Sequence, residues 1–392
     1  MDARATQQNM ESIYLTEEHA ALREQVARFI SREVEPHGAV WEEQGCVPRE
    51  VLRKMGELGF FGITYPAEYG GSEADALTSL VFAEALSRST FGGFVVTALV
   101  HSDMASPHLV HAGSKAQLEK YLPGIIRGEL ITAVAVTEPD AGSDVAGIRT
   151  RARREGTDWV LNGAKMFITN GVLANLYFVA ARTDPNAKGS RGISMFIVEK
   201  GTPGFRVGRA LDKTGWMSSD TAELIFEDCR VPAQNLLGEE NAGFYAVMKN
   251  FQRERIAAAA MAVGNALTSL KLTIEYVKSR KAFGGVLFDK QVIRQRLAML
   301  EAKTHAARQF LYHCGWLATQ ERDCVREVSM LKALTGELAN EVVYTCQQFH
   351  GGMGYMRESS IERLARDARV LSIGGGATEV MLEEVAKRFA PD

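Results

Sequence analysis

The spacing of hydrophobic positions changes twice along this 392-residue chain. Near the N-terminus, apolar residues recur every three or four positions, as they do along one face of an amphipathic helix. The first such helix places Leu22, Val26 and Phe29 on one face, with Thr16 as its expected N-cap. The pattern predicts an N-terminal α-helical domain over residues 1–130.

Short apolar runs separated by turn residues replace the helical period over residues 131–237. The runs are DWVLNGAKMFIT, LYFVAART, GISMFIVEK, GFRVGRAL and AELIFEDCRV. Within the first run, Asn162-Gly163 predicts a hairpin turn, because both residue types tolerate positive φ. We therefore expect a middle antiparallel β domain.

The helical period returns at about Gly238 and continues to the end, which predicts a C-terminal α-helical domain over residues 238–392. Its last helix follows the stretch SIGGGATEV, in which Thr378 is the expected N-cap. Three readings of the glycines in this stretch stay open. They fit a phosphate cradle, a place where a large group passes close to the backbone, or a flexible loop.

Composition narrows the possible partners and compartments. The formal net charge of -3 lacks the basic excess that nucleic-acid binding requires, so nucleic acid is not an expected partner. The five cysteines show no C-x-x-C spacing, which disfavours a disulfide framework or a zinc site and suggests a reducing compartment. We expect no metal site, no membrane span and a cytoplasmic protein.

One carboxylate stands out of place on the long helix predicted from about Asn241 to Arg280. Its apolar stripe is formed by Phe244, Val247, Met248, Phe251, Ala258, Ala262 and Leu270. Glu254 falls on this stripe, and the positions three and four residues away carry no charge. Desolvation should raise the pKa of such a carboxyl, which suits a general base near neutral pH. A distant salt bridge to another helix is the structural alternative.

Several motifs resemble those of the acyl-CoA dehydrogenase family, and they occur in the family's order over nearly the whole chain. They are AVTEPDAGSD (135–144), KMFITNG (165–171), RKAFG (280–284) followed by Gln291, QQFHGGMGYM (347–356) and RDAR (366–369). The resemblance implies an α+β fold with a helical domain, a β domain and a C-terminal four-helix bundle. It also implies FAD-dependent oxidation of an acyl-CoA thioester to the trans-2-enoyl-CoA.

The resemblance also explains the terminal glycines. Most members carry the catalytic glutamate there, in a pattern like Y-E-G-T-S, but Gly375 occupies that position here. Long-chain and isovaleryl-CoA dehydrogenases carry the base on the long helix instead, in a pattern like E-R, which Glu254-Arg255 matches. The long-chain type is the most similar branch. Glu254 is therefore the expected base, and the Gly375 N–H the expected donor to the thioester carbonyl.

Further site residues follow from the resemblance. The expected FAD contacts are Val136, Thr137, Ser143, Phe167, Thr169, Arg280, Phe283, Gln291, Gln348 and Gly352. The expected substrate contacts are Ser143, Phe244, Met248 and Arg255. Partners implied by the family are acyl-CoA, electron-transferring flavoprotein as electron acceptor, and further copies in a homotetramer built from two dimers. In a eukaryote the location would be the mitochondrial matrix, and fatty acid β-oxidation the process.

Two alternatives remain from the sequence. An acyl-CoA oxidase would pass electrons to O2, although such chains are usually much longer. A catalytically silent acyl-CoA-binding flavoprotein would explain the glycine at 375, but Glu254 argues against it. A Rossmann enzyme is excluded because no G-x-G-x-x-G follows a strand and opens a helix.

Overall fold

The computed structural model describes residues 12–187 and 189–389, which belong to two compact units. Unit 1 draws on Met1–Pro36, Asp75–Thr90 and Arg255–Asp392, and unit 2 on His37–Ala74 and Phe91–Glu254. The N-terminal helical region therefore contributes residues to both units, and the long helix passes from one to the other between Glu254 and Arg255.

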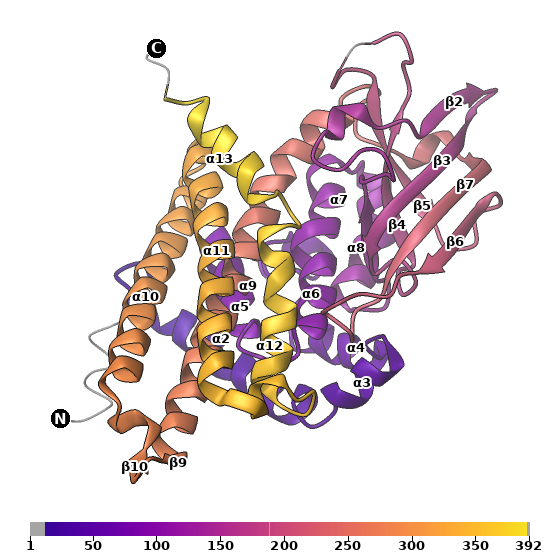
Figure 1. Ribbon diagram of the computed structural model, residues 1–392. Helices are drawn as coiled ribbons and strands as arrows, with labels where there is room; N and C mark the ends of the chain where they lie inside the picture. The colour runs from indigo at the N-terminus through magenta and orange to yellow at the C-terminus, as the bar shows by residue number, and fades with distance from the viewer. Residues whose placement is uncertain (1–11, 188, 390–392) are drawn as a thin grey trace. The chain divides into compact units, whose positions relative to one another are not determined.

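Unit 2 is built around a mixed sheet. Its strands are β1 (Thr132–Ala135), β2 (Arg151–Glu155), β3 (Asp158–Thr169), β4 (Leu176–Arg182), β5 (Ile193–Glu199), β6 (Phe205–Ala210), β7 (Thr221–Val231) and β8 (Leu236–Leu237). All of them except β1 follow the order β6-β7-β3-β2-β4-β5-β8. Strands β3, β7 and β6 lie side by side in Figure 1. Most neighbours are antiparallel, as predicted, but β1 pairs with β4 in parallel and β2 meets β4 in parallel at one position.

The predicted hairpin turn at Asn162-Gly163 is wrong. Strand β3 runs straight through these residues, with a register shift against β7 between Leu161 and Gly163. Gly163 has φ +148, and a Cβ on it would approach Thr150 to 2.6 Å, so close strand contact explains the glycine. The turn between β2 and β3 lies earlier, where Glu155 pairs with Asp158.

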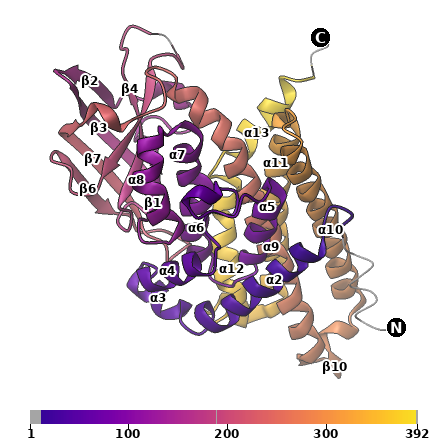
Figure 2. The ribbon, with the colours of Figure 1, turned by 180° about the vertical axis from the view of Figure 1, so that it is seen from behind.

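The helices of unit 2 are α3 (Gly38–Gln44), α4 (Arg49–Glu57), α6 (Gly92–Leu99), α7 (Ser106–Ala112), α8 (Lys115–Ile126) and the start of α9 (Gly243–Ser279). Helices α6, α7 and α8 lie beside the sheet near β1 (Figure 2). A π-helical segment, Val100–Ala105, joins α6 to α7 and contacts β1. The sheet carries a buried aromatic and aliphatic core that includes Trp159, Tyr177, Phe196 and Phe226.

Unit 1 is helical. Its helices are α2 (Glu17–Phe29), α5 (Ala76–Leu86), the rest of α9, α10 (Gln291–Thr319), α11 (Val325–His350), α12 (Ser360–Ala368) and α13 (Thr378–Ala386). Helix α11 packs against α10, α12 and α13 (Figure 1). Residues of α9, α10, α11 and α12 share one hydrophobic core, which includes Leu270, Leu300, Val342 and Leu364. The order of helices, strands and helices agrees with the sequence prediction.

The two predicted helix starts have different outcomes. Thr16 is the N-cap of α2, as expected, with Glu17 and Glu18 in the first turn. Thr378 is the first residue of α13, whose N-cap is Ala377. The Thr378 hydroxyl donates to the Glu337 carboxylate at 2.8 Å, so this side chain ties α13 to α11.

Helix α9 is long and apolar enough to cross a membrane by length and composition alone. However, 83% of its most apolar 18-residue window is buried inside the protein. The core helix of a globular protein has these same properties, so the pattern is weak support for a membrane span.

Candidate active site

The loop that follows β1 lies against β3 in unit 2. The Met166 N–H donates to the Thr137 carbonyl at 2.9 Å, and Lys165 Nζ donates to the Val136 carbonyl at 2.9 Å. The structure thus brings the expected flavin contacts Val136 and Thr137 beside the strand segment that carries Phe167.

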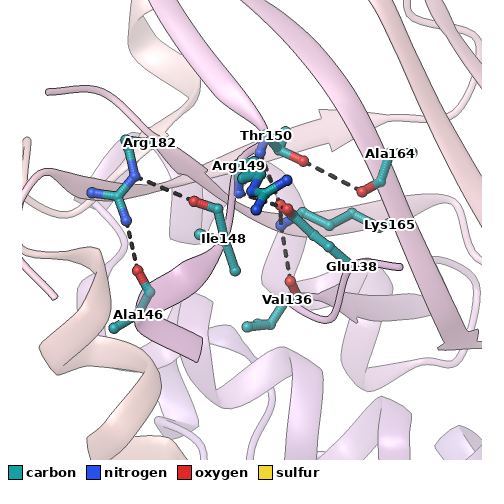
Figure 3. A network of polar contacts seen from close by, with 9 residues as sticks. All are labelled: Val136, Glu138, Ala146, Ile148, Arg149, Thr150, Ala164, Lys165 and Arg182. Atoms are coloured by element: carbon teal, nitrogen blue, oxygen red, sulfur yellow. Dashed lines mark hydrogen bonds and ion pairs between the residues drawn. The ribbon is translucent and has the colours of Figure 1, made fainter. Parts of the chain in front are cut away.

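A buried ion pair holds this loop in place (Figure 3). Lys165 is fully buried, and its Nζ lies 2.7 Å from a carboxylate oxygen of Glu138. The same carboxylate accepts the backbone N–H groups of Arg149 at 2.6 Å and Thr150 at 3.0 Å. Burial lowers the pKa of Lys165 to about 8, although Glu138 opposes the shift.

The ion pair, which acts against burial to raise the pKa of Lys165, lowers the pKa of the Glu138 carboxyl. Burial alone would raise its pKa, but Lys165 and the hydrogen bonds from Thr150 and Arg149 outweigh burial, so the pKa is lowered. Both partners can therefore be charged near neutral pH. Arg182 fixes the next stretch of the loop, donating to the carbonyls of Ile148 at 3.2 Å and Ala146 at 2.7 Å (Figure 3).

Phe167 has an unusual backbone and an exposed ring. Its φ is +60, a left-handed conformation that bulky side chains rarely adopt, and its side chain is 66% exposed. It lies where the β3–β7 register shifts between Lys165 and Ile168. Strained positions of this kind cluster at ligand sites. A surface aromatic ring beside a pinned loop fits a planar ring ligand. Thr169 is half-buried two residues later, and Ser143 is exposed on the loop.

Glu254 has polar partners within unit 2. Its Oε1 accepts a hydrogen bond from Asn250 Nδ2 at 3.0 Å and lies 3.9 Å from His108 Nε2. Asn250 is 2% exposed and also donates to the Met104 carbonyl at 2.7 Å, which fixes the amide. Burial, and then His111, lower the pKa of His108 to about 3, so this imidazole is neutral at pH 7. The Glu254 side chain is 12% exposed.

The sequence prediction for Glu254 is corrected in one respect. As expected, no charged residue lies three or four positions away along the helix. The carboxylate nevertheless has a local partner, because the neutral Asn250, four residues earlier, donates a hydrogen bond to it. The raised pKa stays a prediction. Phe244 and Met248, the expected substrate contacts ten and six residues earlier on α9, are half-buried, as is Arg255 at the start of the unit 1 part of α9.

The glycine turn lies in unit 1, between Ser372 and α13. Gly375 and Gly376 have φ of +64 and +104, which L side chains rarely adopt. Throughout the described chain, no acceptor is hydrogen-bonded to the Gly375 N–H. Within its own unit, a Cβ on Gly375 would meet no atom closer than 4 Å. Gly375 is exposed, so its N–H is a donor that remains available to a ligand within the described chain.

The remaining expected FAD contacts lie on the surface of unit 1. Phe283 sits at the tip of a small hairpin formed by β9 (Lys281–Ala282) and β10 (Gly285–Val286). Its φ is +51 and its ring is 88% exposed, so it repeats the conformation of Phe167. The other four contacts are also exposed: Arg280, Gln291, Gln348 and Gly352.

Three family profiles cover most of this chain. They are the acyl-CoA dehydrogenase N-terminal domain at residues 16–129, the middle domain at 133–229 and the C-terminal domain at 241–390. Long-chain specific acyl-CoA dehydrogenase of Mus musculus is 43% identical over 378 residues, which make up 96% of this chain and 87% of that protein. The chain belongs to the acyl-CoA dehydrogenase family.

Two further relatives agree with this membership. Isovaleryl-CoA dehydrogenase of Pongo abelii is 37% identical over 96% of this chain and 90% of that protein. The crystal structure of a probable acyl-CoA dehydrogenase from Mycobacterium abscessus has a TM-score of 0.93 at 42% identity, covering 96% of this chain and 100% of that one. This acyl-CoA dehydrogenase is thus an oxidoreductase of an FAD-dependent family.

Sequence reasoning missed four polar residues of this acyl-CoA dehydrogenase that hold predicted site residues or their loops: Lys165, His108, Asn250 and Lys332. Lys332 of α11 is 1% exposed, and its Nζ donates to two carbonyls of the glycine turn. A sequence signal existed for Lys332, because it lies on the same stripe as Val328 and Thr335, as Glu254 does on its own helix. His108 left no comparable signal, since its contact with Glu254 joins distant parts of the chain.

Unit 1 also contains a cavity of about 1620 Å³ among α2, α5, α9 and α10. None of the predicted site residues lines it, so the cavity does not mark the predicted flavin or substrate site. No group of three or more His, Cys, Asp or Glu residues suited to a metal ion occurs within residues 12–187 and 189–389.

Proposed function

We propose that this enzyme oxidises a long-chain acyl-CoA to its trans-2-enoyl-CoA, with Glu254 as the base that removes the α-proton. The observation that carries the proposal is the carboxylate of Glu254, almost buried and held by Asn250, in a chain with glycine at 375. The α-proton passes to the Glu254 carboxylate. FAD, when bound, supplies the acceptor for the hydride that leaves Cβ.

The Gly375 N–H binds the thioester carbonyl in this proposal. Charge that develops at the α-carbon spreads onto the carbonyl oxygen, and a fixed donor there stabilises it. The exposed position of Gly375 and its unpaired N–H in the described structure support this role. The open space around its missing side chain supports a reaction in which the carboxylate comes from another position.

The FAD contacts in the proposal are those implied by the family resemblance. Val136, Thr137, Phe167 and Thr169 hold the flavin ring in unit 2, and Ser143 lies near the ring edge and the thioester. The exposed residues of unit 1 hold the pyrophosphate and adenosine, partly of a neighbouring copy: Arg280, Phe283, Gln291, Gln348 and Gly352. The left-handed, exposed Phe167 and Phe283 support this assignment, because each places an aromatic ring where a ligand can cover it.

Long-chain substrates are favoured over branched ones by the higher identity to the long-chain enzyme, 43% against 37% for the isovaleryl-CoA enzyme. Phe244 and Met248 would line the acyl channel, and Arg255 would contact the substrate. We further propose electron-transferring flavoprotein as acceptor, a homotetramer of two dimers, and a role in fatty acid β-oxidation. The location would be the cytoplasm, or the mitochondrial matrix in a eukaryote.

The test is an anaerobic titration of the purified flavoprotein with palmitoyl-CoA, isovaleryl-CoA and a cyclic acyl-CoA, following the visible flavin band. We expect palmitoyl-CoA to bleach the wild type, and Glu254→Gln to slow bleaching by roughly 10²–10⁴-fold, the contribution typical of a general base. Glu239→Gln is the matched control, because this exposed glutamate precedes α9.

Each other outcome has a defined meaning. Bleaching by isovaleryl-CoA or the cyclic thioester alone would overturn the chain-length assignment and keep the mechanism. Equal rates for Glu254→Gln and the wild type would remove Glu254 as the base. Rapid reoxidation by O2 with formation of hydrogen peroxide would support the oxidase alternative over electron-transferring flavoprotein as acceptor.

A further inference from the structure

Lys332 is a buried cation with no assigned task. It lies on α11, is 1% exposed and shares a helix face with the buried Val328 and Thr335. Lysine is almost never fully buried unless a partner compensates its charge, because desolvating an ammonium group is costly. A buried lysine therefore calls for a specific structural reason.

The contacts of Lys332 lie on the two sides of the glycine turn. Its Nζ donates to the Leu371 carbonyl at 2.7 Å and to the Gly376 carbonyl at 2.7 Å. These two residues bracket Gly375, whose N–H is the proposed donor to the thioester carbonyl. The Lys332 side chain thus links the two ends of the turn by hydrogen bonds.

The other hydrogen bonds of the turn hold its first half. Arg369 donates to the Ser372 hydroxyl at 2.7 Å, and the Thr378 hydroxyl lies 3.4 Å from the Ser372 carbonyl. The N–H groups of Ile373 and Gly374 both donate to the Val370 carbonyl, at 2.9 and 2.8 Å. Beyond them, Gly375 and Gly376 follow in left-handed conformations, and consecutive glycines are the most flexible backbone a chain can have. A hydrogen-bond donor that must meet a developing charge works only if it is fixed beforehand.

We propose that Lys332 is a positioning residue of the reaction, which fixes the Gly375 N–H against the thioester carbonyl by binding the carbonyls of Leu371 and Gly376. The inference rests on the proposed role of Gly375. Because Lys332 acts through the turn and not on the substrate, its loss should weaken turnover more than substrate binding.

The experiment compares the Lys332→Met holoenzyme with the wild type, using palmitoyl-CoA for kinetics and hexadecenoyl-CoA labelled with 13C at the thioester carbonyl for vibrational spectroscopy. In the wild type we expect the carbonyl stretch of the bound enoyl-CoA to fall below its value in water. In Lys332→Met it should return toward that value, while kcat falls roughly 10- to 100-fold and KM changes less than about threefold, as for a donor misplaced by about 1 Å.

The matched control is Thr378→Val, which removes another side-chain tie to α11, the bond to Glu337, together with the longer 3.4 Å contact to the Ser372 carbonyl, and leaves both carbonyls bound by Lys332 untouched. It should leave the carbonyl stretch in place and kcat within about twofold. If Lys332→Met does not fold, Lys332→Gln keeps N–H donors on a shorter side chain and should give an intermediate shift of the stretch.

The outcomes separate the inference from the proposed function. A wild type that reduces its flavin and shifts the stretch, with a folded, FAD-loaded Lys332 variant that matches it in both readouts, would overturn only the role of Lys332. An equal loss in Thr378→Val would also overturn it, since general loosening would then explain the effect. A wild type without a shifted stretch would remove Gly375 as the donor, and the Lys332 role with it.

Discussion

Lys165 in unit 2 and Lys332 in unit 1 are both buried, and each holds a loop of the candidate active site through backbone carbonyls. They differ in how their charge is compensated. Lys165 lies 2.7 Å from the Glu138 carboxylate, whereas Lys332 Nζ donates to the carbonyls of Leu371 and Gly376.

The difference separates two kinds of support. Removing Lys165 leaves a carboxylate buried without its counter-charge, which penalises the fold itself. Removing Lys332 leaves only neutral carbonyls, which are less costly to strand. We therefore expect Lys165 to matter most for stability, and Lys332 to matter most for the geometry of the glycine turn.

The largest effect should come from Lys165→Met. We expect the free energy of unfolding to fall by roughly 3–5 kcal/mol, the usual cost of breaking a buried ion pair from one side. Urea denaturation followed by circular dichroism measures this loss. Adding Glu138→Met should recover part of it, because the stranded carboxylate is then gone. A loss below about 1 kcal/mol for the single variant would contradict the comparison.

The pH dependence of Lys332 should have a smaller effect. Burial, and then Arg255 on α9, lower its pKa to about 8 from the ordinary 10.5, while Glu337 on α11 opposes the shift. Below pH 8 the folded and unfolded chains both carry the proton, and between pH 8 and 10.5 only the unfolded chain does. Stability therefore rises with pH across this window, by up to roughly 3 kcal/mol relative to Lys332→Met.

Urea denaturation of the wild type and Lys332→Met at several pH values measures this difference. Arg255→Met should narrow the window from its lower end, because a cation that lowers the pKa of Lys332 has been removed. A difference between wild type and Lys332→Met that stays flat from pH 8 to 10.5 would contradict the lowered pKa of this lysine.

The smallest effect concerns the backbone of the glycine turn. Gly375→Ala should cost about 1–2 kcal/mol of stability, because φ is +64 and an L residue is strained there. Gly374→Ala is the matched control, since a Cβ there meets only ordinary contacts with Val370, the nearest at 3.5 Å. Thermal unfolding of the two variants gives the comparison. Equal melting temperatures would contradict the strain expected for an L residue at position 375.

The sequence predicted the order of helices, strands and helices, because hydrophobic period is a local property. It placed strands β4, β5, β6 and β7 and the start of α2 correctly. It was wrong at Asn162-Gly163, where Gly163 serves a close approach to Thr150, the residue directly before β2, a contact that a local turn signal cannot reveal. The parallel pairing of β1 with β4 is likewise a long-range property.

The residues of the candidate site also fall into two groups: those that the sequence pattern reveals and those whose contacts only the folded chain shows. Glu254 could be proposed from the sequence because a charge on an apolar stripe is visible there. Its support by His108 could not be found, since 146 residues separate these side chains. The networks of Lys165 and Lys332 also join distant segments, and only the folded chain brings their partners together.

Phe167 is a position where two demands on a protein oppose each other. Its left-handed backbone would suit glycine better, and its ring is 66% exposed. Phenylalanine therefore stabilises the fold neither through its backbone conformation nor through burial of its ring. Selection for a sturdier fold alone would therefore replace it. Directed evolution for heat resistance should discard this phenylalanine readily when screened on folding, and keep it when screened on turnover.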